Sequence, residues 1–347
     1  MKRKKKSGVG LRAVLIVLCI ALGMILTLLA GGTWYAHHLM NMMNRVESGQ
    51  EQTLSQEELD QMLSDETVAP DETQGPVLKE EDIDFGSQET PVIETGEHIV
   101  NILLIGQDAR EGEGRSRSDS MILVTFNTET KTITMTSFLR DMYVQIPGYT
   151  DNKLNAAYPA GGMELLNKTL EVNFGVRVDG NVEVDFTHFA DVIDLVGGVD
   201  LELREDEAAY INNATGVRAL GAGMMHLNGE QALVYSRIRS LDNDADFSRT
   251  NRQRKVIQAL IEKFRNTKLP TLLKLMDDLL PMITTDMSNS EMISYATELF
   301  PMLRECTIVS QRVPADGAYQ TATIRDMSCI LADMDAARKL LQDTMSD

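Results

Sequence analysis

The sequence predicts an α/β protein with a layered core, preceded by a single membrane-spanning helix and an acidic linker. Three observations support this prediction. Residues 13–36 contain no charged side chain, and residues 47–97 are strongly acidic. From residue 98 onward, short apolar runs typical of strands alternate with amphipathic runs typical of helices. Mixed strands and helices within one domain favour helices packed in layers on a sheet.

The N-terminal apolar run is long enough to cross a bilayer as a helix, at about 1.5 Å per residue. Residues 1–12 form a basic tail before it. Basic residues favour the cytoplasmic side of a membrane, and the aromatic rings of Trp34 and Tyr35 favour the interface at the other end. We therefore expect a single-pass protein of the cell membrane with a cytoplasmic N-terminus and an extracytoplasmic domain. A cleaved signal peptide is the alternative, although its apolar stretch is usually shorter.

The charge of the chain limits its partners. It contains 33 Lys and Arg against 52 Asp and Glu, a formal net charge of -19. This excess of acid argues against general nucleic-acid binding, because phosphate backbones bind basic surfaces. Sixteen acidic residues and one lysine lie between residues 47 and 97. Such self-repelling sequences stay extended, so residues 37–97 are predicted to form a flexible linker.

Three apolar runs at the start of the folded part predict neighbouring strands. They are HIVNILLIG at 98–106, SMILVTFN at 120–127 and TITMTSF at 132–138. In an antiparallel meander, the end of the first strand, the start of the second and the end of the third share one edge of the sheet. Four charged residues should therefore converge at that edge: Asp108, Asp119, Arg140 and Asp141.

Asp108 and Asp119 are candidate metal ligands. Two carboxylates that meet repel each other unless a cation compensates them, and oxygen ligands suit Mg²⁺ or Mn²⁺. In the alternative interpretation, Asp108 caps the loop and Asp119 pairs with Arg115 or Arg117. The chain contains no zinc motif and no G-x-x-x-x-G-K-[ST] phosphate loop, which argues against a zinc site and against an ATP or NAD enzyme.

The rest of the chain alternates helices and strands. A helix over 163–175 ends at a glycine, and VEVDF, THFADVIDLV, GGVDLEL and GEQALVYSRI predict a strand, a helix, a strand and a helix in turn. A long amphipathic helix begins at Phe247. Residues 268–347 are predicted to be a helical extension with short strand-like runs, which packs on the domain or completes it. Whether Cys306 and Cys329 form a disulfide stays open at this point.

The stretch SRIRSLDNDADFSRTNRQRK, residues 236–255, carries five arginines and a lysine against three aspartates. Extending the apolar stripe of the long helix backwards, at 100° per residue, places Arg249 and Gln253 on its inward face and Lys255 on its outer face. By the same phase, Arg252 and Arg254 lie on the flanks of the helix.

An inward arginine at the first turn of a helix needs an anion. The helix N-terminus adds amide donors and a partial positive charge. Arg237 and Arg239 are two residues apart, so they point the same way if the segment is extended. The planar guanidinium suits phosphate because it offers two parallel hydrogen bonds. An anion site and internal pairing with the three aspartates are both compatible with the sequence.

Six segments then occur in one order: NILLIGQDAREGEGRSRSDSMILVTFN, SFLRDMYVQIPG, KLNAAYPAGG, DLVGGVDLEL, LNGEQALVYSRIRS and DFSRTNRQRKVIQAL. This series closely resembles the LytR-CpsA-Psr family of bacterial cell-envelope proteins. The resemblance implies a three-layer α/β/α domain over residues 98–267, with a mixed central sheet and an apolar pocket for a prenyl chain.

The resemblance also implies a phosphotransferase on the outer face of the membrane of a Gram-positive-type bacterium. Such a protein would move a glycopolymer, of the teichoic acid or capsule type, from a polyprenyl-pyrophosphate carrier onto peptidoglycan and form a phosphodiester. The alternatives are a non-enzymatic envelope protein that binds lipid pyrophosphate or regulates, and a pyrophosphate hydrolase.

Matching by motif carries the family's functional positions onto this chain. Asp108 and Asp119 would bind Mg²⁺, with Mn²⁺ as a second choice, and Asp119 is the candidate acceptor of the hydroxyl proton. The catalytic group implied by the resemblance is Asp119, Arg140, Arg237 and Arg239. Further pyrophosphate contacts are implied for Arg117 and Arg249, with support from Arg252, Gln253 and Asp246. One position departs from the family pattern: Leu139 replaces the usual proline, which predicts a less rigid Arg140.

Overall fold

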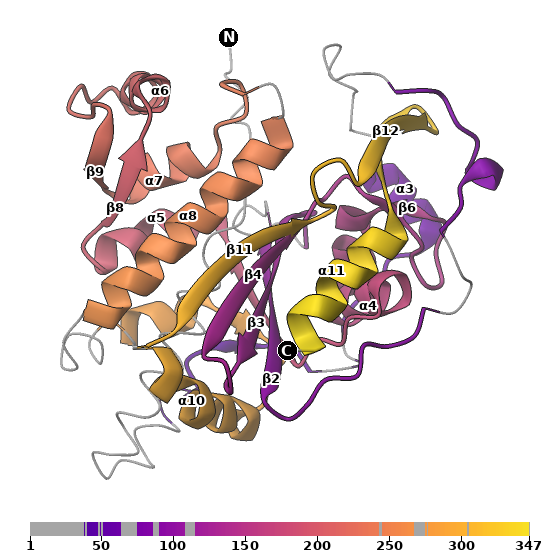
Figure 1. The fold of residues 1–347 in the computed structure, drawn as a ribbon, viewed down its shortest axis with the longest axis horizontal. Helices are drawn as coiled ribbons and strands as arrows, with labels where there is room; N and C mark the ends of the chain where they lie inside the picture. Colours follow the sequence, from indigo (N-terminus) through magenta and orange to yellow (C-terminus); the bar gives the residue numbers. More distant parts are fainter. Residues whose placement is uncertain are drawn as a thin grey trace.

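A seven-stranded mixed sheet forms the centre of the molecule (Figure 1). The computed structural model describes residues 38, 40–47, 49, 51–63, 75–85, 90–107, 115–242, 245–266, 275, 277–303 and 305–346. The strand order is β1-β10-β7-β2-β3-β4-β11. β2 (Ile99–Gln107), β3 (Ser118–Asn127) and β4 (Thr132–Phe138) pair antiparallel in sequence order. The predicted meander is therefore confirmed.

The outer strands of the sheet come from distant parts of the chain. β7 (Gly180–Asp185) runs parallel to β2, and β10 (Thr284–Thr285) pairs antiparallel with β7. β1 (Asn44–Arg45) adds to β10 at one edge, and β11 (Thr307–Val313) runs parallel to β4 at the other. The sheet is mixed, as predicted.

Helices cover both faces of this sheet (Figure 1). One face carries α5 (Phe186–Leu195), α7 (Gly229–Ser236) and α8 (Ala245–Asn266). The opposite face carries α4 (Ala157–Phe174) and α11 (Met334–Ser346). Because both faces are covered, β2 and β3 are buried along their whole length and read as continuous apolar runs rather than as alternating ones.

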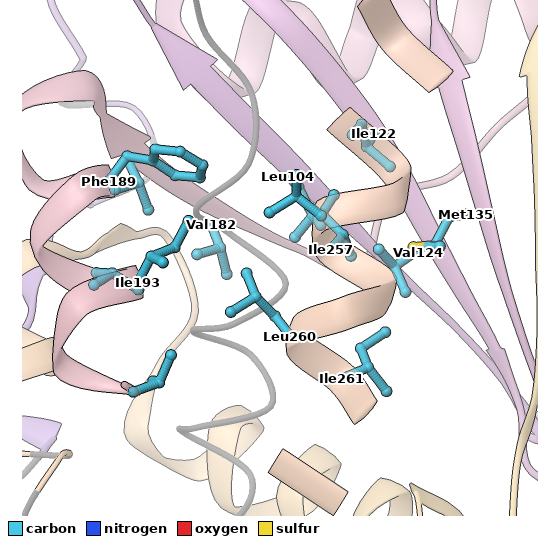
Figure 2. Close-up of a cluster of buried hydrophobic side chains, with 14 of the residues drawn as sticks. Leu104, Ile122, Val124, Met135, Val182, Phe189, Ile193, Ile257, Leu260 and Ile261 are labelled. Carbon is cyan, nitrogen blue, oxygen red and sulfur yellow. The ribbon is translucent and has the colours of Figure 1, made fainter. Parts of the chain in front are cut away.

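The apolar stripe of α8 packs as its sequence phase predicts. Figure 2 shows Ile257, Leu260 and Ile261 of α8 in one buried cluster with Leu104 of the sheet and Phe189 of α5. These side chains are at most 3% exposed. Burying an aliphatic side chain contributes about 1.5–3 kcal/mol, so this stripe fixes the rotation of α8 about its axis.

Smaller elements complete the chain. α6 (Glu205–Thr215) lies beside the hairpin of β8 (Val199–Leu203) and β9 (Gly223–Leu227). β5 (Tyr143–Val144) pairs with β6 (Asn152–Lys153), and the short helix η2 (Leu154–Ala156) leads into α4. α4 ends at Gly175, which has φ 73° and closes the helix as the sequence predicts.

The C-terminal part is not simply helical. η3 (Leu280–Met282) and α10 (Asn289–Leu303) lead into β11, and β12 (Tyr319–Ile324) then pairs with β13 (Met327–Ala332) in a separate hairpin. The run CTIVSQRV becomes β11 because β4 would otherwise leave its backbone donors and acceptors exposed at a sheet edge. Residues 268–347 complete the domain through this strand. Cys306 and Cys329 are buried thiols that form no disulfide with each other.

Part of the segment predicted as a flexible linker, residues 37–97, is folded onto the domain. α3 (Gln56–Leu63) and η1 (Glu80–Asp82) lie in this region, together with β1. Met40, Met43 and Leu59 are buried, at 1%, 6% and 0% exposed. A few apolar side chains thus hold an acidic segment on the domain.

The predicted membrane anchor, residues 13–36, lies outside the described residues. Within the part of the chain that the structure describes, no helix has the length and apolar character needed to span a bilayer.

Candidate active site

The loop after β4 is pinned by backbone hydrogen bonds on three sides. The Leu139 amide donates to the Val313 carbonyl of β11 at 3.0 Å. The Asn155 amide donates to the Arg140 carbonyl at 3.1 Å, and the Ile330 amide donates to the Asp141 carbonyl at 2.8 Å. A proline at position 139 could not make the first of these bonds, because it has no amide proton. The hydrogen bond from the Leu139 amide therefore orients the backbone at Arg140, whereas a proline would do so by fixing φ.

Arg140 lies at the centre of a chain of alternating charges. Its Nη1 donates to Asp119 Oδ1 at 2.7 Å, and its Nε donates to Asp141 Oδ2 at 3.2 Å. Lys153 Nζ lies 3.0 Å from the other oxygen of Asp141. Asp119 is only 6% exposed. Charged groups so far from water need partners of opposite sign, and this network supplies them.

The predicted convergence at this sheet edge is confirmed for Asp119, Arg140 and Asp141. Asp108 lies outside the described residues. The alternative pairing of Asp119 with Arg115 or Arg117 is wrong, because Asp119 bonds to Arg140. Arg115 instead pairs with Glu51 at 3.1 Å, and Arg117 Nη2 donates to the Met62 carbonyl of α3 at 3.2 Å.

A buried polar cluster supports the same edge, and sequence reasoning did not identify it. Gln107, the last residue of β2, donates through Nε2 to the Glu183 carboxylate of β7, and its Oε1 accepts from the Ser116 amide at 2.9 Å. Tyr158 donates to Glu183 Oε2 at 2.7 Å. Burial and the nearby Glu183 charge raise the pKa of Tyr158 well above its usual value. In the sequence, Glu183 inside the strand GNVEVD is the residue that could have indicated this buried cluster.

The arginine-rich stretch begins where α7 ends. Arg237 caps that helix with φ −105° and ψ −5°, so the extended backbone that would align Arg237 with Arg239 does not begin at Arg237. Ile238 between them is fully buried, whereas both arginines are partly exposed. Asp244 and the side chain of Asp246 lie outside the described part of the stretch.

The predicted inward positions of Arg249 and Gln253 on α8 are confirmed. Arg249 is 2% exposed and Gln253 is 1% exposed, whereas Lys255 lies at the surface. Arg249 occupies the second turn of a helix that begins at Ala245, where the helix N-terminus favours a nearby anion.

Arg252 is held by internal partners. Its Nε donates to Glu207 Oε1 of α6 at 2.8 Å, its Nη1 donates to the Ile238 carbonyl at 3.1 Å, and its Nη2 donates to Asp242. Asp242 also accepts from Arg204 at 2.8 Å. Internal pairing with aspartate is thus confirmed for Arg252.

Arg254 was not among the predicted site residues, yet it is 5% exposed. Its guanidinium donates to Ser310 Oγ of β11 at 2.6 Å and to Ser137 Oγ of β4 at 2.7 Å. Burial, together with the charge of Arg312, lowers the pKa of Arg254 to about 10. Ser137 precedes Arg140 by three residues, so the first turns of α8 lie at the end of β4 that carries Arg140.

Asp119 is the described candidate ligand for a metal ion. Within the described residues, no group of three or more His, Cys, Asp or Glu side chains gathers in a way that could hold an ion. Asp119 supplies one buried carboxylate at the sheet edge, and its Oδ1 also accepts from Arg140. A hard oxygen ligand of this kind suits Mg²⁺ or Mn²⁺, and β2 ends at Gln107, directly before Asp108.

Comparison with known proteins gives consistent results. The LytR_cpsA_psr family model matches residues 64–339. The regulatory protein MsrR of Staphylococcus aureus (strain COL) is 33% identical over 255 residues, covering 72% of this chain and 75% of that protein. The polyisoprenyl-teichoic acid--peptidoglycan teichoic acid transferase TagT of Bacillus subtilis (strain 168) is 32% identical over 257 residues, covering 72% and 78%.

A solved structure shares the fold. It is the LytR-CPS2A-psr family protein YwtF (TagT) with bound octaprenyl pyrophosphate lipid, with a TM-score of 0.56 and 28% sequence identity. The match covers 76% of this chain and 98% of that one. The order of the motifs, the mixed sheet with its charged edge and the match over residues 64–339 agree, and the chain belongs to the LytR-CpsA-Psr family.

Proposed function

We propose that this protein is a membrane-anchored phosphotransferase that moves a glycopolymer from a polyprenyl-pyrophosphate carrier to peptidoglycan. The observation that carries the proposal is the buried bond between Asp119 and Arg140 at the charged sheet edge. The named activity of TagT and the octaprenyl pyrophosphate bound in the YwtF structure support it. The polymer is proposed to be of the teichoic acid or capsule type.

The reaction follows from the chemistry of a pyrophosphate. A hydroxyl oxygen of the acceptor attacks the phosphorus atom that carries the glycopolymer and forms the new phosphodiester. The bond from that phosphorus to the bridging oxygen breaks, and polyprenyl phosphate leaves with the electron pair. The hydroxyl proton passes to a carboxylate, for which Asp119 is the candidate. Negative charge on the phosphates must be compensated throughout.

The arginines of the site supply this compensation. Arg140 is fixed by Asp119 and Asp141, so its guanidinium is oriented before substrate arrives. Arg237, Arg239 and Arg249 are proposed to contact the pyrophosphate, with Arg117 and Gln253 beside them. Asp246 is proposed to orient one of these arginines. Arg252 keeps α6 and α8 together through Glu207, and we assign it a positioning role.

Asp108 and Asp119 are proposed to hold Mg²⁺ or Mn²⁺. When bound, the ion would neutralise charge on the phosphate oxygens. We further propose that residues 13–36 anchor the chain in the cell membrane, with the domain on the outer face. A lipid-linked donor then meets the site at the membrane surface.

A transfer assay with lipid-linked glycopolymer, peptidoglycan and Mg²⁺ tests this proposal. Arg140→Ala should lower the transfer rate by about 10²–10³, the usual effect of losing one well-placed donor. Arg140→Lys should recover part of the rate, because it keeps the charge but not the planar fork. Arg218→Ala is the matched control, since Arg218 lies exposed in the loop between α6 and β9.

The products separate the competing functions. Polymer bonded to peptidoglycan supports transfer, and free polymer indicates a hydrolase instead. Tight donor binding without either product indicates a non-enzymatic binding protein. Circular dichroism on Arg140→Ala and Arg140→Lys checks that both variants are folded. Transfer by a folded Arg140→Ala at the wild-type rate would refute the assigned site.

A further inference from the structure

A pocket lies between the segment 78–85 and the β12–β13 hairpin. We call it the hairpin pocket. Its volume is about 380 Å³, within the range of about 300–1,000 Å³ that small-molecule sites occupy. Tyr143 and Met334 are its buried lining residues. None of the predicted site residues lines it.

Negative charge surrounds this pocket. Three of its lining residues, Asp82, Asp84 and Asp333, are exposed aspartates, and its lining contains no Lys, Arg or His. Arg325 lies near Tyr143, but it pairs with Glu80 at 2.8 Å. A cavity bordered by charges of one sign attracts ligands of the other sign. Phosphate groups are therefore disfavoured here, in contrast to the arginine-rich edge.

The aromatic lining adds a second preference. Phe85 stacks on Tyr143 with ring centroids 6.1 Å apart, and Tyr319 lines the same pocket. Ring faces attract ammonium groups. Tyr143 is 2% exposed, and the Arg325 guanidinium lies over its ring, 6.0 Å from the centroid. The accessible aromatic surface of the pocket therefore comes mainly from Phe85 and Tyr319, which are only partly buried.

The hairpin pocket is connected to the proposed active site at two places. Tyr143 follows Arg140 by three residues, and the loop between them bonds to Ile330 of β13. Tyr319 packs on Phe247, with ring centroids 4.7 Å apart, and Phe247 precedes Arg249 by two residues on α8. The hairpin pocket is therefore built on the same loop and the same helix that carry Arg140 and Arg249.

We propose that the hairpin pocket binds a primary ammonium group carried by the acceptor polymer. The inference rests on the proposed transfer to an acceptor. The carboxylates attract the ammonium group, and the aromatic side chains of Phe85 and Tyr319 pack against its carrier. The ammonium group has two possible sources in peptidoglycan, an amino sugar without its acetyl group and a peptide amine.

Calorimetric titration of the full chain tests this proposal with two pairs of probes. The first pair is a glucosamine tetramer and its fully N-acetylated counterpart. The second is a blocked tetrapeptide with one lysine and the same peptide with acetylated lysine. We expect the charged member of at least one pair to bind and its acetylated partner to bind more weakly. The pair with the tighter charged member identifies the source of the amine.

Charge-removing variants locate the binding. Asp84→Asn and Asp333→Asn should each weaken binding about two- to fivefold, the effect expected for one partly exposed charge pair. Asp333 Oδ1 accepts from the Ala336 amide at the start of α11, and asparagine preserves this cap. Asp343→Asn, exposed near the end of the same helix and outside the pocket, is the matched control.

Titration with inorganic pyrophosphate keeps this inference separate from the proposed function. Pyrophosphate binding should not change in the pocket variants. If pyrophosphate binds and the charged probes bind no better than their acetylated partners, the hairpin-pocket proposal is overturned alone. If the Asn variants bind the charged probes as wild type does, it is overturned as well. Absence of pyrophosphate binding would count against the proposed function instead.

Discussion

Leu139 stands directly before Arg140, where relatives of this chain are expected to carry proline. Its amide donates to Val313 at 3.0 Å, and its side chain is 1% exposed. We predict that Leu139→Pro lowers the urea midpoint, because it removes this bond at a net cost of about 0.5–1.5 kcal/mol. Leu139→Met keeps the amide and nearly the same volume, and serves as the control. A proline variant at least as stable as the methionine variant would contradict this account.

Asp242 provides a test of pH dependence. Arg204 and Arg252 donate hydrogen bonds to it, and this lowers its pKa below the ordinary 3.8. A carboxylate with a lowered pKa stabilises the folded state above its ordinary pKa, and this contribution is lost as the pH falls through the folded-state value. We expect the urea midpoint of Asp242→Asn to be lower than wild type at neutral pH and to fall less steeply in acid.

The control for that experiment is Asp191→Asn, an exposed aspartate of α5. Its midpoint should follow the wild-type curve throughout. Parallel curves for Asp242→Asn and wild type would mean that the two arginines do not stabilise the folded state through Asp242.

Among single residues, helical phase predicted the inward positions of Arg249 and Gln253 but not the burial of Arg252 and Arg254. Phase gives the direction of a side chain relative to the apolar stripe. It contains no information on which neighbours cover the flanks. Here α6 covers one flank and β11 the other, and both contacts join residues far apart in the sequence.

At the scale of elements, the kink in α4 depends on a glycine. Gly162 has φ 68° and ψ −152°, a backbone conformation that residues other than glycine rarely adopt. The Glu51 carboxylate accepts from the amides of Met163 and Glu164 just after the kink, at 3.1 Å each. A Cβ at position 162 would overlap Glu51 and Arg115. Sequence pattern predicted the helix from residue 163, where the regular part resumes.

We predict that Gly162→Ala destabilises the fold by more than the roughly 1–3 kcal/mol of backbone strain alone. The additional loss comes from displacing Glu51 from the helix start. Gly148→Ala is the matched control, because Gly148 also has positive φ, 84°, but a Cβ there meets nothing within 4 Å. Thermal unfolding of both variants gives the comparison. Equal losses would show that the Glu51 contact adds nothing.

At the scale of the whole molecule, the acidic N-terminal segment belongs to the fold. Its composition predicted a linker because net charge describes the segment as a whole, whereas a few buried side chains, Met40, Met43 and Leu59, attach it to the core. Long-range pairing such as β1 with β10 leaves no local pattern in the sequence. The meander, by contrast, was predictable because its strands are adjacent and each is a continuous apolar run.

This difference predicts the behaviour of shortened chains. A chain beginning at residue 98 should have a clearly lower urea midpoint than one beginning at residue 38, because each buried Met or Leu that is lost contributes about 1.5–3 kcal/mol. Leu59→Ala in the longer chain should reproduce part of the loss, about 2–5 kcal/mol. Identical midpoints for the two chains would restore the linker interpretation.

The two edge strands of the main sheet, β1 and β11, pair with strands that lie far from them in the sequence. Gln311 of β11 bonds to Thr136 of β4, 175 residues earlier in the chain. Ribosomes add about 5–20 residues per second, so β4 waits about 9–35 s for its neighbour. During synthesis the strand that leads to Arg140 is therefore an open edge, and the catalytic loop acquires its anchor at Val313 only when nearly the entire polypeptide has emerged.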